Sequence, residues 1–442
     1  TGVQTCALPI LKEEISFSTE KMKQFTEYMD HQMQEGLSGR PSDLKMLPSF
    51  VTSLATGDEV GMVLSVNLGG SKVRVSKIRL FGGCRLSIEK EVVHPVTEEL
   101  KHGTAVELFG FIADAICEVN PEKGIKAGFS FSFPCELSSC KKGVLMEWTK
   151  GYSVSGCIGE DPVLLLQNEL TKRNISVQIV ALCNDSVSTL VAHSYRNTKA
   201  AIGVVLGSGT NAAYIEQIAN IPKFHSETHS SSMIVNMEWG ALGTSDRSIL
   251  PFTSLDEEID ITSINPGKQY LEKMMGGLFL GELIRLWIVK CRKANELLTR
   301  VDLSNRLFTE AMAFDSSLCR SILLDDSSDY SEIEGILHSF DIRHSSSYDR
   351  KLIYTIVDAV VTRSARLMGA CLYTVLTHMR ESGKQGTVGI GGSVYKYLPG
   401  YKKRIMKALE ELGMEEVNCS IVEDASCRGT ALIAYAVTPR YM

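Results

Sequence analysis

Apolar residues near the start of the chain recur at steps of three to four positions among charged ones. They are Ile15, Phe17, Met22, Phe25, Met29 and Met33. This spacing places apolar side chains on one face of an α-helix. It predicts a helix over residues 11–35, which the glycine- and proline-containing segment 36–41 ends.

The pattern then changes to alternation, with apolar residues at every second position from Val60 to Leu68. Alternation predicts a β-strand. Gly69-Gly70-Ser71 interrupts the run, and a second extended stretch covers 73–80. The segment is therefore predicted to be a strand, a glycine turn and a second strand.

The same construction returns at residues 202–218. An apolar stretch from Ile202 to Leu206 leads into Gly207-Ser208-Gly209-Thr210-Asn211, and an extended stretch continues to residue 218. Two hairpins of one construction in a single chain suggest an internal duplication of a domain.

Helical and extended segments alternate along the rest of the chain. Helical periodicity covers 97–120, 161–173, 266–289 and 348–381, and short apolar strands are predicted at 128–133, 177–182, 387–390 and 417–422. This alternation indicates an α/β fold. Because no low-complexity linker separates the halves, we expect two lobes packed around one cleft.

Composition narrows the class of protein. The 442 residues are 44% hydrophobic and carry a net charge of −6, which argues against non-specific nucleic-acid binding. The apolar runs are too short for a membrane span. The 12 cysteines lack the spacing of a zinc site; Cys135 and Cys140 come nearest, and buried free thiols are the ordinary interpretation. With no secretory signal evident, we expect a cytoplasmic protein, and we leave Thr1–Ile10 out of the fold prediction.

The two glycine turns are candidates for phosphate binding. Backbone N–H groups in a turn without side chains can approach phosphate oxygens, and the guanidinium of Arg74 could add charged donors. A plain hairpin turn is the alternative. No Walker-type motif is present, so a P-loop enzyme is excluded.

Polar residues in apolar surroundings are the other candidates. Asn184-Asp185 follows the apolar run 177–182, at the carboxyl end of a predicted strand, where α/β sheets bind ligands. A carboxylate there can accept a proton from a substrate hydroxyl, although Asn-Asp-Ser is more often a helix cap. Asn211, Glu238 and Glu272 could meet polyol hydroxyls; taken singly, each acid is more often a surface or paired carboxylate.

Together these segments resemble the eukaryotic hexokinase family, the hexokinases and glucokinases, from about Leu47 to Val437. The motifs that carry the resemblance are GFSFSFP (128–134), WTKGY (148–152), ALCNDS (181–186), LGSGTNAAY (206–214), NMEWGALG (236–243) and NPGKQYLEKMMGGLFLG (265–281). The resemblance implies a two-lobed actin-like ATPase fold, a duplicated ribonuclease H-like unit with a central cleft. We expect an N-terminal arm and helix at 1–47, a small lobe at 48–186 and a large lobe at 187–442.

The resemblance also implies roles for individual residues. Asp185 would be the general base and Lys150 would balance charge near the reacting oxygen. Sugar contacts would come from Ser132, Thr149, Lys150, Asn184, Asp185, Asn211, Glu238 and Glu272. ATP would be bound with Mg²⁺ by Gly69, Gly70, Ser71, Arg74, Ser208, Gly209, Gly392, Ser393 and Ser426, with no residue assigned as a direct metal ligand.

Departures from the family pattern fall on the nucleotide side. Asn67 and Gly391 stand where the family has Asp, and Ala425 and Cys427 stand where it has Gly. Lys72 could compensate by meeting phosphate directly. Two hypotheses follow: a hexokinase that phosphorylates glucose or a related hexose, the first step of glycolysis, or a glucose-binding regulator with little turnover. We expect a monomer or homodimer without a nucleic-acid partner.

Overall fold

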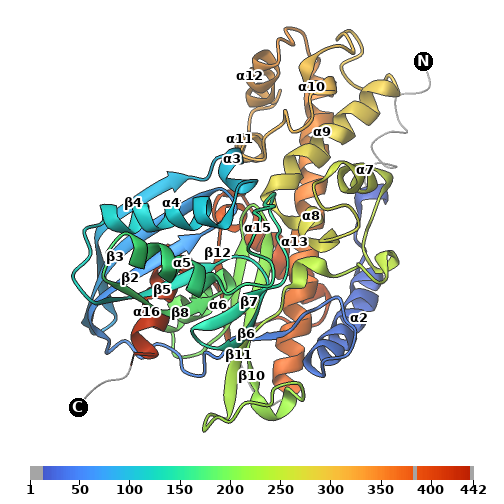
Figure 1. The fold of residues 1–442 in the computed structure, drawn as a ribbon. Helices are drawn as coiled ribbons and strands as arrows, with labels where there is room; N and C mark the ends of the chain where they lie inside the picture. Colours follow the sequence, from blue (N-terminus) through green and yellow to red (C-terminus); the bar gives the residue numbers. More distant parts are fainter. Residues whose placement is uncertain (1–12, 382–385, 439–442) are drawn as a thin grey trace.

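Two β-sheets form the frame of the molecule (Figure 1). The computed structural model describes residues 13–381 and 386–438. The segment Thr1–Ile10, which the sequence analysis set aside, lies outside them. No helix in the described ranges is long and apolar enough to cross a lipid bilayer.

The first sheet has five strands in the order β4-β3-β2-β5-β8. Their bounds are β2 Val60–Leu68, β3 Lys72–Gly82, β4 Arg85–Pro95, β5 Ile125–Phe131 and β8 Val177–Cys183. The strands β2, β3 and β4 are antiparallel neighbours, whereas β5 and β8 run parallel to β2. The two hairpin strands predicted around the first glycine turn are therefore confirmed.

Alternation along β2 places two cores on opposite faces of this sheet. Leu64 packs with α4 (Ala105–Glu118) and α5 (Pro162–Lys172), and Val63 packs with α16 (Ala425–Ala436). Successive side chains of a strand point to opposite faces, so one apolar strand serves both cores.

The second sheet has six strands in the order β1-β11-β10-β9-β12-β13. Their bounds are β1 Leu47–Pro48, β9 Ala200–Leu206, β10 Thr210–Gln217, β11 Ser232–Asn236, β12 Thr387–Gly391 and β13 Cys419–Ile421. An antiparallel hairpin is again followed by two parallel strands, β12 and β13. The shared strand order of the two sheets confirms the duplication predicted from the glycine turns.

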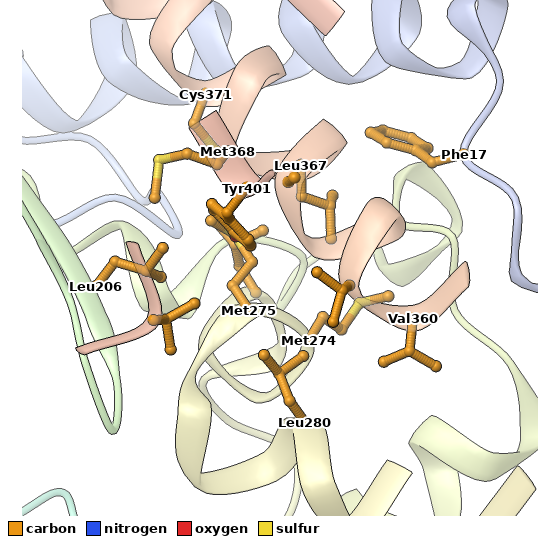
Figure 2. Close-up of a cluster of buried hydrophobic side chains, with 14 of the residues drawn as sticks. Phe17, Leu206, Met274, Met275, Leu280, Val360, Leu367, Met368, Cys371 and Tyr401 are labelled. Atoms are coloured by element: carbon orange, nitrogen blue, oxygen red, sulfur yellow. The ribbon is translucent and has the colours of Figure 1, made fainter. Parts of the chain in front are cut away.

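Helices dominate the second lobe. The longest is α13 (Ser347–Glu381), which contacts α2 (Thr19–Leu37), α9 (Gly277–Lys293) and α15 (Tyr401–Glu411). Figure 2 shows Leu367, Met368 and Cys371 of α13 gathered with Tyr401 and the methionines of α8 (Tyr270–Met275). Tyr401 is fully buried, and its hydroxyl meets the Ser364 hydroxyl at 2.7 Å, so its polar atom has a partner in the core.

The remaining elements are short or peripheral. The helices are α3 Glu98–Lys101, α7 Ser254–Thr262, α10 Arg306–Thr309, α11 Leu318–Leu324, α12 Ser331–Ser339 and α14 Ser393–Tyr397; the 3₁₀ turns are η1 Ile218–Asn220, η2 Trp239–Ala241 and η3 Arg247–Ile249. A two-stranded hairpin, β6 (Cys135–Ser139) with β7 (Lys142–Leu145), stands beside the first sheet.

Two helices join the sheets. α6 (Asp185–Ser194) packs on β9 of the second sheet, and α16 packs on α6 as well as on β2 and β5 of the first. The predicted large lobe spanned 187–442, yet its last helix lies against the first sheet. Side chains from both sheets and both helices form one further core.

Helix boundaries differ from the predictions in three places. The helix predicted over 11–35 corresponds to α2, which begins at Thr19. There the Ser18 side chain accepts a hydrogen bond from the backbone N–H of Lys21 and caps the helix. The helix predicted over 97–120 is α3 and α4, because Thr104 and Glu107 form a capping box that starts a new helix. The helix predicted over 266–289 is interrupted at Gly276, whose extended backbone separates α8 from α9.

Candidate active site

Asn184 and Asp185 lie where β8 ends and α6 begins, as the sequence predicted for a ligand site. Asn184 is the N-cap of α6, and its Oδ1 accepts a hydrogen bond from Ser186 N at 3.0 Å. Asp185 is the first residue of the helix and is 9% exposed.

A chain of amides surrounds Glu238. Its Oε1 accepts hydrogen bonds from Nδ2 of Asn236 at 2.8 Å and Nδ2 of Asn184 at 3.3 Å. Asn211 donates from Nδ2 to Asn236 Oδ1 at 2.8 Å and to Asn184 Oδ1 at 3.1 Å. Residues from the N-cap of α6, from β10 and from β11 thus hold one carboxylate, although they are far apart in sequence. Glu238 has a left-handed backbone (φ 55°), so its side chain leaves the end of β11 in a fixed direction.

Glu272 enters from the other side, on α8. Its Oε2 accepts a hydrogen bond from Thr210 N at 3.0 Å. Gly209 passes so close that a Cβ at this position would lie 2.1 Å from Glu272 Oε2. The second glycine turn therefore needs glycine here to make room for an acidic side chain, in addition to any contact with phosphate.

Lys150 reaches the same site from the first lobe. Its Nζ donates to the backbone carbonyl of Ser132 at 2.8 Å and lies 3.9 Å from Asp185 Oδ2. The neighbouring Tyr152 donates its hydroxyl to Gly69 O at 3.0 Å, which ties this segment to the first glycine turn. Lys150 is thus the cation nearest to the predicted general base in the described contacts.

All eight residues predicted to contact a sugar line one cavity. They are Ser132, Thr149, Lys150, Asn184, Asp185, Asn211, Glu238 and Glu272. Gly70, Val205, Ser208, Gly209, Thr210 and Gln269 complete its wall. The cavity therefore presents carboxylates, amides, hydroxyls and one ammonium group to a single small ligand, a donor and acceptor set that suits a polyol.

Burial changes the titration of the two glutamates. Burial raises the pKa of Glu238, although the hydrogen bond from Asn236 and the charges of Lys45 and Lys150 oppose this. Burial likewise raises the pKa of Glu272, against the charge of Lys150. Ionised carboxylates in such a place gain from any ligand that donates hydrogen bonds to them.

A second cavity opens on the other side of Asp185. The first glycine turn, the end of β12 and the start of α16 form its walls, with Asn67, Lys72, Thr189, Lys396 and Glu423 among the lining residues. Ser132, Asp185 and Val205 line both cavities. Asp185 therefore lies at their junction, where a group in one cavity can react with a group in the other.

Comparison with known proteins gives the family of this chain. Two family models, both described as hexokinase, match residues 8–195 and 201–436. The chain is 33% identical to Hexokinase-2, chloroplastic, of Nicotiana tabacum, over 99% of this chain and 92% of that protein. The chain belongs to the hexokinase family. It is also 34% identical to Hexokinase-2 of Rattus norvegicus, over 95% of this chain and 47% of that protein.

A solved structure has the same fold. The hexokinase of Schistosoma mansoni, determined in complex with glucose, is 31% identical and superposes with a TM-score of 0.90 over 97% of this chain and 98% of that one. The family and the two-lobed hexokinase fold predicted from the motifs are confirmed.

The residues predicted to bind nucleotide in this hexokinase divide between the two cavities. Gly69, Arg74, Gly392, Ser393 and Ser426 line the second cavity. Gly70, Ser208 and Gly209 line the first, and Ser71 lines neither. The second glycine turn thus lines the first cavity, whereas the sequence analysis assigned it to the nucleotide.

Charged partners already surround Arg74. Its Nη1 lies 3.1 Å from Asp424 Oδ1 and 3.9 Å from Glu91 Oε1. Asp424 also lies 3.7 Å from Arg428. Two carboxylates therefore already offset the positive charge of Arg74. Lys72 lines the same cavity, and the described contacts include no ion pair for it, so its charge is more available to a phosphate than that of Arg74.

Two departures from the family pattern touch each other. A Cβ built on Gly391 would lie 3.1 Å from the Cβ of Ala425, closer than ordinary contact. The resemblance described above implies an Asp at the first position and a Gly at the second in the family. In this chain Gly391 has no side chain and Ala425 has one. The side-chain volume lost at the first position is thus regained at the second, on the same wall of the cavity.

The sequence analysis missed several lining residues. Gln269 lies three positions before Glu272, at the N-cap of α8, and was inside a quoted motif. Thr210 and Val205 flank the second turn. Lys396, Tyr397 and Glu423 gave no signal in sequence, because only the packing of α14 and α16 brings them to the cavity.

The second cavity continues past α14. Ser393 and Tyr397 also line an adjoining cavity with Asp315, Ser316, Ser317 and Arg320, a segment that the sequence analysis did not single out. Together, the second cavity and the adjoining cavity are lined by residues from β2, β12, α11 and α16. No group of three or more His, Cys, Asp or Glu side chains suited to a metal occurs among the residues that the structure describes.

Proposed function

We propose that this hexokinase transfers the γ-phosphoryl group of ATP to the 6-hydroxyl of glucose or a related hexose. The supporting observation is the position of Asp185, which lines both the polyol-type cavity and the second cavity. A sugar in the first cavity and a nucleotide in the second would meet at this carboxylate. The product, a hexose 6-phosphate, would enter glycolysis.

Each residue then has a role in one displacement. Asp185 accepts the proton of the 6-hydroxyl as its oxygen forms a bond to the γ-phosphorus, and the bond from phosphorus to the bridging oxygen breaks to release ADP. Lys150, 3.9 Å from Asp185, balances the negative charge around the reacting oxygen. Glu238, Glu272, Asn184 and Asn211 orient the sugar through its other hydroxyls.

The phosphates would lie along the first glycine turn. Gly69, Lys72 and Arg74 line the cavity there, and Ser393 and Ser426 line it near α14 and α16. We place the adenosine end toward α14, where Ser393 and Tyr397 connect the two adjoining cavities.

Mg²⁺ would arrive with the nucleotide and neutralise charge on its phosphates. Asn67 lines this cavity, and its Oδ1 is buried without a hydrogen-bond partner in the described structure. An unpaired acceptor suits a water ligand of Mg²⁺, so the residues present fit the metal through an outer contact. Asn67 lacks the charge of an aspartate, and we expect weaker metal retention for that reason.

Hexose 6-phosphate formation by Asp185→Asn tests the proposal. The change keeps the shape of the side chain and removes the base, so we expect kcat to fall by ~10²–10⁴ at saturating glucose and Mg²⁺-ATP. Glucose binding, followed by intrinsic fluorescence, should persist.

Asp326→Asn is the matched control, because Asp326 is an exposed carboxylate outside both cavities. Its kcat should equal that of the unchanged protein. An Asp185→Asn variant with undiminished kcat would refute the assignment of the base. A protein that binds glucose and never phosphorylates it would instead support the regulator hypothesis.

A further inference from the structure

Three charged side chains join the two lobes beside the sugar cavity. In the sequence, Glu147 stands between Leu145 and Trp148, and both of these residues belong to the core of the first lobe. Lys45 lies between two buried residues of the second-lobe core, and Lys268 lies two positions before Tyr270 of that core. The contact among Lys45, Glu147 and Lys268, which we call the lysine–glutamate bridge, therefore crosses between lobes.

Each carboxylate oxygen of Glu147 has its own lysine. Oε1 is paired with Lys45 Nζ, and Oε2 lies 2.9 Å from Lys268 Nζ. Burial raises the pKa of Glu147, but the hydrogen bonds from the two lysines outweigh it and lower the pKa overall. Lys45 and Glu147 are about a quarter exposed, whereas Lys268 is 60% exposed. The Nζ of Lys223 donates a hydrogen bond to the backbone carbonyl of Lys45 at 2.6 Å, which holds the backbone of Lys45 in place.

The bridge is adjacent to residues that line the sugar cavity. Glu147 is followed two and three positions later by Thr149 and Lys150, and Lys268 is followed by Gln269. Trp148, between these groups, stacks on Tyr152 with ring centroids 5.4 Å apart. A contact at Glu147 therefore acts directly on the segment that brings Thr149 and Lys150 over the cavity.

We propose that Glu147 is a positioning residue that holds the Trp148–Lys150 segment against the second lobe and thereby sets hexose affinity. This inference rests on the proposed function, since it concerns the same sugar cavity. The bridge favours the arrangement in which both lobes contact the sugar. When only a fraction of molecules has that arrangement, the apparent dissociation constant rises in inverse proportion to the fraction.

A double-mutant cycle with Glu147→Gln and Lys268→Gln tests the bridge. Surface ion pairs contribute little singly, so we expect the Kd and KM for glucose to rise about 2- to 10-fold in Glu147→Gln, with kcat within about twofold. Lys268→Gln should have a smaller effect and none in the Glu147→Gln background. Raising the salt concentration should weaken glucose binding by the unchanged protein and leave Glu147→Gln nearly unaffected.

Two readouts separate positioning from general stability. Trp148 is next to the bridge and partly buried, whereas Trp239 follows Glu238 of the sugar cavity and Trp287 is enclosed in the second lobe. The part of the glucose-dependent tryptophan fluorescence that a Trp148→Phe variant loses therefore reports on this segment. Hydrogen exchange at the amides of residues 142–152, measured without sugar, should be faster in Glu147→Gln.

Glu122→Gln is the matched control. Glu122 is paired with Lys77 Nζ at 2.6 Å, and both residues belong to the first lobe, so the change removes an ion pair that does not cross the cleft. Glucose affinity and exchange at 142–152 should be unchanged in this variant.

Additive effects in the cycle, or unchanged glucose affinity in Glu147→Gln, would overturn the inference. A protein that binds glucose without phosphorylating it would count against the proposed function, and the cycle in binding would still decide on the bridge. If glucose did not bind at all, the proposed function would fail, and exchange at 142–152 alone would decide: equal rates in both proteins would reject the bridge.

Discussion

The carboxylate of Glu238 is half-buried and accepts hydrogen bonds from three amide side chains, and this environment determines how its charge responds to pH. Burial raises its pKa, so its proton returns at a higher pH than for an exposed glutamate. A protonated carboxyl group accepts hydrogen bonds from sugar hydroxyls less well than a carboxylate.

Glucose affinity should therefore weaken as the pH falls, beginning above the ordinary titration range of a glutamate. Glucose titrations between about pH 5 and 8 would measure this. In Glu238→Gln the affinity should be lower at all pH values and its pH dependence flatter, with the remainder due to Glu272. A dependence that is identical in both proteins would contradict the assignment to Glu238.

A second prediction at the scale of single residues concerns the contact between positions 391 and 425. A side chain added at Gly391 meets Ala425 Cβ, so Gly391→Asp should destabilise the protein by ~1–3 kcal/mol and raise the KM for ATP. Combining it with Ala425→Gly should recover much of the loss, with an interaction energy of ~0.5–3 kcal/mol. Urea denaturation and ATP titration of the four proteins would measure the cycle; strictly additive effects would show that the two positions are independent.

Among the elements, α2, α13 and β10 meet at a buried ionic cluster. His378 of α13 lies 2.8 Å from Glu216 Oε2 of β10 and 3.3 Å from Asp30 Oδ1 of α2. Burial alone would lower the pKa of His378, but hydrogen bonds with Asp30 and Glu216 raise it to about 9. The charged imidazole thus ties the N-terminal helix to the second sheet.

The stability of this contact should depend on pH. The pKa of His378 is raised on folding, so its contribution is complete below about pH 6.5 and is lost as the pH rises through about 9. The difference in unfolding free energy between the unchanged protein and His378→Gln should shrink by ~1–3 kcal/mol between about pH 6 and 9.5. Urea denaturation across this range would test it, with the exposed His338→Gln as the control.

In the whole molecule, α6 and α16 connect the two sheets, and glycine permits their close approach. A Cβ on Gly429 of α16 would lie 1.8 Å from the carbonyl oxygen of Ser188 in α6. The third core, which includes side chains of both sheets, depends on this contact.

Gly429→Ala should therefore destabilise the protein by ~1–3 kcal/mol or more. Gly335→Ala is the matched control, since its added Cβ meets nothing within 4 Å on α12 and should stabilise that helix by up to ~1 kcal/mol. Thermal unfolding followed by circular dichroism would compare them. Equal melting temperatures for Gly429→Ala and the unchanged protein would mean that the helices can separate without cost.

Local patterns in the sequence were sufficient for much of the fold and for the sugar site. Alternation predicted β2, and the repeated glycine turns predicted the internal duplication, because both signals are set by neighbouring residues. Motifs identified the family, and the eight residues predicted to contact a sugar are among the fourteen that line the first cavity. Apolar periodicity predicted a single helix where the structure has α8 and α9, because Gly276 divides a continuous apolar pattern.

Other features were decided only by the tertiary structure. The return of α16 to the first sheet, the entry of Lys396 and Glu423 into the second cavity, and the contact of Gly391 with Ala425 involve residues separated by long stretches of chain. Glu147 gave no signal in sequence, because its two lysines lie 102 positions before it and 121 positions after it. Periodicity and capping are local properties, whereas the position of a side chain in a cleft depends on how separate lobes pack.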